Sequence, residues 1–459
     1  MFATKMTSLE RRAVFSLVTI LSLRMLGLFM VLPVFALYAS RLPGSTATTV
    51  GIALGIYGLS QAICQIPFGT LSDRFGRKPL IAVGLSIFII GSLMAGFANS
   101  ITLLIIGRTL QGAGAVGSTI LAALADLTRE EQRTKTMAIA GIAIGMSFSM
   151  AMFIGPVLTQ WLPIHGLFFC AALLGLITLM ILFLYAPTPQ RIEWHRGTEP
   201  EWHSFFQLLM TPALAKLNAG IFILHAVFTA SFIVIPIRLL QSFGFDAHHQ
   251  WVIYLPTLLI AFILSLIFIG IAERKHQLKP YFLVGIGCLL GANILFYFGT
   301  LHFNCMLIAI GLFFTGFSLL EAFLPSLISR TAPKERKGSA LGLYSCAQFL
   351  GIFVGGALGG WIYGQYHFTG VYIFCFMLSL FWFILACFMQ PPRYFITQCW
   401  QIASSYQSHW QTWLADLQSI PGMIEITFVA EENMAYLKME SKTKQHPDLI
   451  RLKAQLQSQ

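Results

Sequence analysis

The stretch Gly69-Thr-Leu-Ser-Asp73-Arg74-Phe-Gly76-Arg77-Lys78 decides the fold, because it sets a group of charges between two long apolar runs. The runs cover about residues 48–71 and 79–98, and about 20 apolar residues form one helix across a bilayer. Charges are costly inside a membrane, so the stretch is predicted to be a short loop between two spans. Gly69 permits close approach of helices, and Gly76 permits the tight turn.

The composition of the whole chain indicates a membrane protein. Of its 459 residues, 56% are hydrophobic and 10% are charged, against about 25% charged in an ordinary soluble domain. A water-soluble enzyme and a disordered chain are both excluded, because neither could keep so apolar a sequence in solution. The net charge of +11 does not indicate nucleic acid, because the basic residues gather at the ends of apolar runs.

Apolar runs between polar breaks predict twelve membrane-spanning helices. They lie near residues 13–39, 48–71, 79–98, 101–127, 136–160, 166–186, 213–240, 250–272, 280–299, 303–329, 339–363 and 367–389. The runs are continuously apolar rather than alternating, which favours helices over a barrel. Lys and Arg gather in the N-terminal segment and after even-numbered spans, whereas the opposite loops carry Arg41 alone. This bias predicts that both termini are cytoplasmic.

The two halves of the chain resemble each other. Phe29-Met-Val-Leu-Pro33-Val in the first span matches Phe232-Ile-Val-Ile-Pro236-Ile in the seventh, and Asp73-Arg74 matches Glu273-Arg274. The repeat predicts two six-helix bundles, residues 1–190 and 213–390, joined by a cytoplasmic linker at 191–212. Such an architecture places a substrate cavity at the interface of the repeats.

The last part of the chain, residues 393–459, has a different composition. It shows a β-prone run at Tyr394–Ile396, an amphipathic stretch at 401–418, a hairpin pattern at Ile424–Val429 and Ala435–Met439, and a helical end at Pro447–Gln457. The order β-α-β-β-α suits a small ferredoxin-like domain without its final strand. The expected fold is therefore an all-α membrane protein with a small cytoplasmic α+β domain, which could associate with itself or bind a ligand.

The 69–78 stretch resembles the signature of the major facilitator superfamily, Gly-x-x-x-Asp-Arg-x-Gly-Arg-Lys. Asp73 lies where a carboxylate could meet the N-terminus of span eleven, near Ser339. The resemblance implies that Arg77 holds an acid at the inner end of span four, where Asp126 stands. A latch is predicted that favours the outward-open state, built from Gly69, Asp73, Arg74, Gly76, Arg77, Lys78 and Asp126. The alternative is a plain positive-inside anchor, which needs neither the aspartate nor the glycines.

Two further stretches resemble superfamily motifs. Arg108-Thr-Leu-Gln111-Gly112-Ala-Gly114 in span four matches Arg-x-x-Gln-Gly-x-Gly, in which the resemblance assigns the arginine to proton coupling. The alternative is a structural arginine bonded to backbone carbonyls. Gly141, Gly145, Gly155 and Pro156 in span five resemble the antiporter motif, although Val157-Leu158 stands where Gly-Gly often follows. There the alternative is small-residue packing with a proline kink.

Arg24, His225 and Glu321 are ionisable residues deep inside predicted spans. Such residues are functional candidates, because charge inside a bilayer is costly. A carboxyl group or an imidazole in this setting can exchange protons near neutral pH. Glu321 is the first candidate for proton coupling, His225 the second, and Arg24 the counter-charge of either, with Arg108 tuning the site. The alternative for His225 is a histidine satisfied by packing.

Several stretches are similar to a narrower group, the YajR-type transporters of Gram-negative bacteria. They include Leu23-Arg24-Met25-Leu26-Gly27, Gln65-Ile66-Pro67-Phe68-Gly69 and Leu324-Pro325-Ser326-Leu327-Ile328-Ser329. The resemblance covers nearly the whole chain and implies a proton-coupled exporter with a cytoplasmic ferredoxin-like domain.

The sequence therefore predicts a transporter of the bacterial inner membrane, a proton-driven antiporter that exports small amphipathic or drug-like compounds, as multidrug efflux proteins do. The alternatives are a metabolite importer of the same fold and a membrane sensor that signals through residues 393–459. No nucleotide-binding loop, zinc-protease motif, Cys/His metal spacing or nucleophile elbow occurs. No catalysis, cofactor, metal or nucleic acid is thus expected, and the expected partners are membrane lipid, a small-molecule substrate and protons.

Overall fold

The computed structural model describes residues 6–188, 207–298, 302–333, 336–390, 395–401, 410–429, 434–440, 443 and 446–457. The chain divides into a membrane unit, Met1–Met389, and a C-terminal unit, Gln390–Gln459. Most of the predicted linker at 191–212 lies outside the described residues, and a helix begins at its last position, Pro212.

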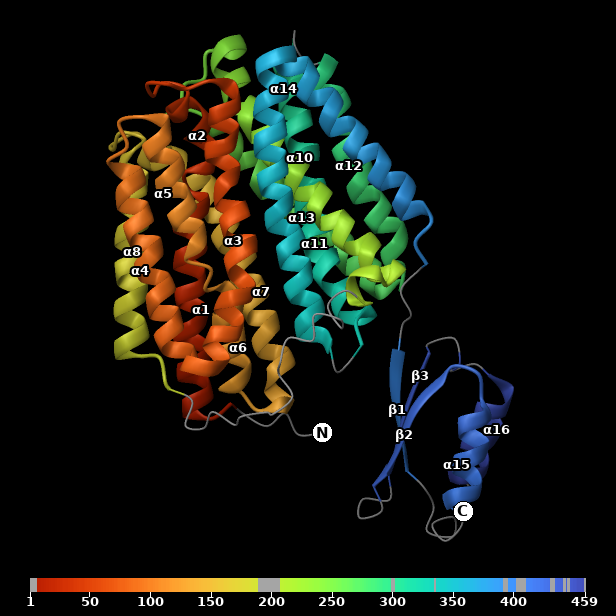
Figure 1. The fold of residues 1–459 in the computed structure, drawn as a ribbon. Coiled ribbons are helices and arrows are strands. Elements are labelled where there is room, and N and C mark those ends of the chain that lie inside the picture. The colour runs from red at the N-terminus through yellow and green to blue at the C-terminus, as the bar shows by residue number, and fades with distance from the viewer. Residues whose placement is uncertain are drawn as a thin grey trace. The chain divides into compact units, whose positions relative to one another are not determined.

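The first half of the membrane unit is a helical bundle, coloured red to yellow in Figure 1. Its helices are α1 (Ser8–Phe29), α2 (Leu32–Ala39), α3 (Ala47–Phe75), α4 (Arg77–Gly96), α5 (Ile101–Ala113), α6 (Gly117–Asp126), α7 (Glu130–Leu158) and α8 (Gly166–Leu184). Two predicted spans are each broken once. The first breaks beside Pro33, which has no N–H for the helical ladder, and the fourth breaks between Ala113 and Gly117.

The second half forms another bundle, coloured green to blue in Figure 1. Its helices are α10 (Pro212–Phe243), α11 (Trp251–Arg274), α12 (Leu278–Phe298), α13 (Phe303–Thr331) and α14 (Lys337–Cys387). His367 inside α14 has non-helical angles, φ 54° and ψ −152°. The predicted spans eleven and twelve meet at this residue.

Ten helices among the described residues are long and apolar enough to cross a membrane. One of them, within α14, holds two spans, and α5 with α6 makes a further broken span. The helices thus account for the twelve predicted spans. The predicted fold class, an all-α membrane protein with a small α+β region, is confirmed.

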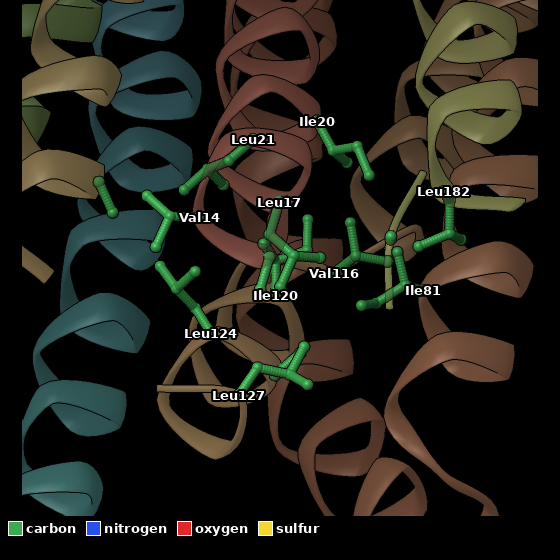
Figure 2. Close-up of a cluster of buried hydrophobic side chains, with 14 of the residues drawn as sticks. Val14, Leu17, Ile20, Leu21, Ile81, Val116, Ile120, Leu124, Leu127 and Leu182 are labelled. Carbon is green, nitrogen blue, oxygen red and sulfur yellow. The ribbon is translucent and has the colours of Figure 1, made fainter. Parts of the chain in front are cut away.

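Buried apolar side chains from α1, α4, α6 and α8 hold the first bundle together (Figure 2). Leu17 and Leu21 of α1 gather with Ile120 and Leu124 of α6, and all four are at most 2% exposed. In a lipid environment such contacts stabilise a bundle through close packing rather than through exclusion of water. This cluster fixes α6, and therefore the break before it, against α1.

The two bundles touch along α3 and α14, which lie side by side (Figure 1). Gly51, Gly55 and Gly58 of α3 have no room for a side chain, because a Cβ there would overlap the backbone of α14. No atom, in contrast, lies within 4 Å of a Cβ placed at Gly69. We call the end of the membrane unit that holds Gly69 and Asp126 the latch end, and the opposite end the far end. The expectation that helices approach closely at Gly69 is wrong for this structure, since the bundles touch toward the far end.

The C-terminal unit is a three-stranded antiparallel sheet with two helices. Its elements are β1 (Phe395–Gln401), α15 (Trp410–Ser419), β2 (Met423–Val429), β3 (Met434–Glu440) and α16 (Pro447–Gln457), and the strand order is β1-β3-β2. The predicted hairpin is β2 and β3. Of the predicted amphipathic stretch at 401–418, Gln401 belongs to β1, which pairs with β3, residues 410–418 lie in α15, and 402–409 lie outside the described residues. Trp400, Trp413 and Leu437 form part of its core.

Candidate functional site

Glu321, His225 and Gln348 come together from three helices of the second bundle. The amide nitrogen of Gln348 on α14 lies 2.9 Å from Nε2 of His225 on α10 and 3.4 Å from Oε1 of Glu321 on α13. The distance from His225 Nε2 to Glu321 Oε2 is 3.8 Å. We call these three residues the proton network, because Glu321 and His225 are the predicted candidates for proton coupling. The sequence predicts two of its members, Glu321 and His225, and gives no sign of Gln348.

The hydrogen bonds define which nitrogen of His225 carries hydrogen. Its Nδ1 lies 3.3 Å from the carbonyl oxygen of Ile221, which can only accept, so Nδ1 donates. A neutral imidazole then accepts at Nε2, where the Gln348 amide donates. Glu321 Oε2 is buried and has no hydrogen-bond partner among the described residues. Among the described residues, the network therefore has one buried acceptor without a donor, Oε2 of the Glu321 carboxyl group.

Aromatic rings from both bundles lie beside the proton network. The ring of Phe317 lies 5.6 Å from that of His225, and Phe228 lies 4.4 Å from Phe317, measured between centroids. Phe148 of α7, from the first bundle, lies 5.4 Å from Phe317 and 5.0 Å from Phe29. These four phenylalanines form an aromatic cluster that joins the bundles beside the network.

Arg24 lies in the first bundle and makes no hydrogen bond or ion pair to Glu321 or His225 among the described residues. Its side chain is 0% exposed. Its Nη2 donates to Tyr57 Oη at 3.3 Å, to Gln61 Oε1 at 3.3 Å and to the Gly114 carbonyl at 3.0 Å. The predicted counter-charge role therefore has no contact to support it, because α1 turns Arg24 toward α3 and the α5–α6 break.

Arg108 is also buried, at 4% exposure. It donates to Gln111 Oε1 at 2.9 Å and to the carbonyls of Ala53 and Leu54 at 3.5 and 3.4 Å. Its guanidinium lies 5.2 Å from the centre of the Tyr57 ring. These contacts correspond to the structural interpretation, and proton coupling by Arg108 remains a prediction.

The glycines of the same motif serve close packing. A Cβ at Gly112 would overlap the Tyr57 carbonyl, and one at Gly114 would overlap the Gly84 carbonyl. Gln111 donates to Ser92 Oγ at 2.8 Å. Residues 108–114 therefore bring α5 against α3 and α4.

At the latch end, Arg77 joins two carboxylates of the first bundle. It pairs with Asp73, and its Nε lies 2.9 Å from Asp126 Oδ2. Lys78 donates to the Ala186 carbonyl at 2.9 Å. Gly76 has φ +92°, which fits the turn between α3 and α4. The guanidinium carbon of Arg74 lies 5.5 Å from the centre of the ring of its neighbour, Phe75.

Among the described residues, no hydrogen bond or ion pair joins Asp73 to the second bundle. Asp73 pairs with Arg77 on its own side, and among the described residues no hydrogen bond or ion pair joins it to Ser339. The separation of the bundles at Gly69 gives the reason. The second bundle has a pair of its own, Arg330 Nη2 to Glu273 Oε1 at 2.7 Å.

The predicted antiporter motif divides into two parts along α7. A Cβ at Gly155 would overlap the Met30 carbonyl, so α7 is tightly packed there against the α1–α2 break, with Pro156 next in the helix. No atom lies within 4 Å of a Cβ at Gly141 or Gly145. Only the Gly155 part of the motif therefore packs closely in this state.

The profile of the Major Facilitator Superfamily matches residues 17–355 and 303–397, so the chain belongs to this superfamily and is a multi-pass secondary transporter. The inner membrane transport protein YajR of Escherichia coli strain K12 is 42% identical over 438 residues, 95% of this chain and 96% of that protein. The quinolone resistance protein NorA of Staphylococcus aureus strain Mu50 is 26% identical over 355 residues, 73% of this chain and 86% of that protein.

Solved structures show the same fold. The structure of a D-xylose-proton symporter has a TM-score of 0.65 at 15% sequence identity, and the match covers 82% of this chain and 98% of that chain. The predicted superfamily and the predicted resemblance to YajR-type transporters are confirmed.

Proposed function

We propose that the protein is a proton-driven antiporter that exports small amphipathic compounds across a bacterial inner membrane. The proton network of Glu321, His225 and Gln348 carries this proposal. A carboxyl group and an imidazole inside membrane helices are costly and are typical of ion and substrate pathways. The relationship to a quinolone resistance protein and the Gly155-Pro156 pair support export by antiport.

The network can hold one proton in alternative arrangements. A proton on Glu321 turns Oε2 into a donor, and His225 Nε2 lies 3.8 Å from this oxygen. Protonation also removes the charge of the carboxylate, so the bundles can move around the site without carrying a bare charge through a medium of low dielectric constant. Substrate binding would compete with this proton, which couples the two flows.

One proton per cycle is enough for useful export. A membrane potential of 100 mV supplies about 2.3 kcal/mol per elementary charge. Since about 1.36 kcal/mol corresponds to a tenfold ratio, one charge sustains a gradient of roughly fifty-fold.

We infer from the Lys and Arg bias of the loops that both termini and the latch end face the cytoplasm. The contact of the bundles toward the far end then corresponds to a state open to the cytoplasm. In the opposite state the bundles 1–190 and 213–390 close at the latch end, where Asp73 would meet the start of α14 near Ser339. Arg77 and Asp126 hold the end of the first bundle rigid for this contact.

The test uses inside-out membrane vesicles that contain the full chain, energised by respiration, with ethidium as the transported probe. Wild-type vesicles should accumulate ethidium and release protons when it is added. Glu321→Gln should reduce both rates at least tenfold, whereas Asp246→Asn, a control carboxylate in the exposed far-end loop, should reduce neither. Proton release by Glu321→Gln at the wild-type rate would overturn the proposal.

Intact cells separate export from import. When the proton gradient is dissipated, an exporter's substrate should accumulate in cells that produce the chain. A fall in the cellular content of the same probe would indicate a symporter instead.

A further inference from the structure

The α5–α6 break holds a cationic group that the proton network does not use. Arg24 is 0% exposed, and its Nε and Nη1 have no hydrogen-bond partner among the described residues. Its one bonded nitrogen, Nη2, reaches neutral acceptors: a phenol, an amide and a backbone carbonyl. A buried guanidinium without an anionic partner is costly, so its free nitrogens point to a ligand.

The described carboxylates of the first bundle are already engaged elsewhere. Among those the structure describes, Asp73 and Asp126 pair with Arg77, and Glu10 pairs with Arg129, all at the latch end. Arg24 therefore has no described carboxylate to neutralise it. Arg108 adds a second buried cation near the same tyrosine, Tyr57, which strengthens the positive potential.

The start of α6 faces the free side of Arg24. Outside its own stretch of chain, a Cβ placed at Gly117 would have one described atom within 4 Å, Arg24 Nη1 at 4.0 Å. The first hydrogen bond of α6 runs from the Ile120 amide to the Val116 carbonyl, so the amides of residues 117–119 precede the helical ladder, and no side chain caps them. Unbonded amides at a helix N-terminus attract anions. The buried hydroxyls of Ser118 and Thr119 also have no described partner.

We propose that the α5–α6 break binds the anionic group of those transported compounds that carry one, so that the substrates include amphipathic monocarboxylates as well as cations such as ethidium. The carboxylate would lie beside Gly117, between Arg24 Nη1 and the first amides of α6. Gly117 and Ser118 are half-buried, so the start of α6 is less enclosed than Arg24 itself. Tyr57 extends the site toward the second bundle, since its ring lies 6.3 Å from that of Phe349, the neighbour of Gln348. This inference rests on the proposed transport function and adds the chemical class of its substrate.

The first experiment compares two probes of nearly equal shape, 1-naphthoate and its neutral amide, 1-naphthamide. Binding to the purified full chain in phosphatidylcholine nanodiscs is measured by quenching of tryptophan fluorescence at pH 7.5. We expect at least a tenfold preference for naphthoate. Equal affinity of the wild-type chain for both probes would overturn the inference without any variant.

Gly117 offers a matched pair of variants. Gly117→Asp places a carboxylate within reach of Arg24 and should lower the naphthoate preference at least tenfold by occupying the site. Gly117→Asn has the same size without the charge and should retain most of the preference. Equal preference in both variants would contradict the inference, and Arg24→Gln gives a second measurement in which the preference should also be lost.

A lipid headgroup and a transported compound can be distinguished at this site. Nanodiscs that include phosphatidylglycerol test the headgroup, since competition by this lipid that removes naphthoate binding would assign the site to lipid and overturn the substrate assignment. Glu321→Gln should keep the naphthoate preference, because the proton network is separate from the α5–α6 break. If the preference holds while Glu321→Gln still exchanges protons, the proposed proton site fails and the anion site stands.

Discussion

Gln348 is the side chain that connects the two ionisable groups of the proton network. Its amide donates to both His225 and Glu321. Gln348→Leu leaves the buried Nε2 of His225 unpaired, at a cost of about 1–3 kcal/mol. It also removes the donor that reaches the partly exposed Glu321 carboxyl group. We expect a lower midpoint of thermal unfolding and at least a tenfold slower proton-coupled uptake of ethidium into inside-out vesicles.

A matched control for Gln348 is Asn293 on α12, whose amide bonds within its own helix to the Leu289 carbonyl. Asn293→Leu removes a buried amide of similar polarity whose hydrogen bond does not reach the proton network. Uptake should stay near the wild-type rate in this variant. If both variants transport equally well, Gln348 has no part in coupling.

The sequence reveals some site residues and not others for physical reasons. Glu321 and His225 stand out because ionisable residues in an apolar span are rare. Gln348 is uncharged and gives no such signal, and its role depends on α14 packing against α10. Arg24 is predicted as a counter-charge, but the rotation of α1, which sets its partners, cannot be obtained from spacing along the chain.

At the scale of helices, two glycines of α7 have different surroundings, so substitutions at them should affect folding and transport differently. Gly155 is packed against the Met30 carbonyl, whereas Gly145 faces open space. Gly155→Leu should therefore prevent assembly of the folded protein, detected as loss of the monodisperse peak in size-exclusion chromatography. Gly145→Leu should fold normally.

The same pair of variants tests the antiporter motif. If α7 packs closely at Gly145 in the opposite state, Gly145→Leu should fold yet slow ethidium uptake at least tenfold. Normal uptake by Gly145→Leu would restrict the function of the motif to Gly155 and Pro156.

Helix positions are predictable because continuous apolar runs fix them, and α3, α7 and α11 end within a few residues of the expected limits. The positions of the helix breaks are harder to predict from the sequence. Pro33 marks the first, but the one after Ala113 follows glycines that also serve close packing, so composition alone does not distinguish the two uses. Strand β1 extends to Gln401 because pairing with β3 outweighs the amphipathic pattern there.

At the scale of the whole molecule, α3 and α14 keep one antiparallel register. Gly51 faces Gly356 and Gly360, Gly58 faces Phe349, and the Ala62 carbonyl lies 3.8 Å from Cys346 Sγ. Moving a given number of residues toward the C-terminus of α3 therefore corresponds to moving about the same number toward the N-terminus of α14. Gly69 lies seven residues after Ala62 on α3, and Ser339 lies seven residues before Cys346 on α14. The two positions are apart in this structure.

Continuing this register predicts that Gly69 and Ser339 meet when the transporter closes at the latch end. The pair Gly69→Cys and Ser339→Cys, in a chain whose eight native cysteines are replaced, should cross-link with a short dimaleimide only while the protein cycles. The cross-link should stop ethidium uptake. Ala62→Cys with Cys346 retained is the control pair, because these positions are already close and should cross-link without cycling. Failure of the Gly69 and Ser339 pair to react, while the control pair reacts, would show that the helices close in a different register, and the latch at Asp73 would lose its geometric basis.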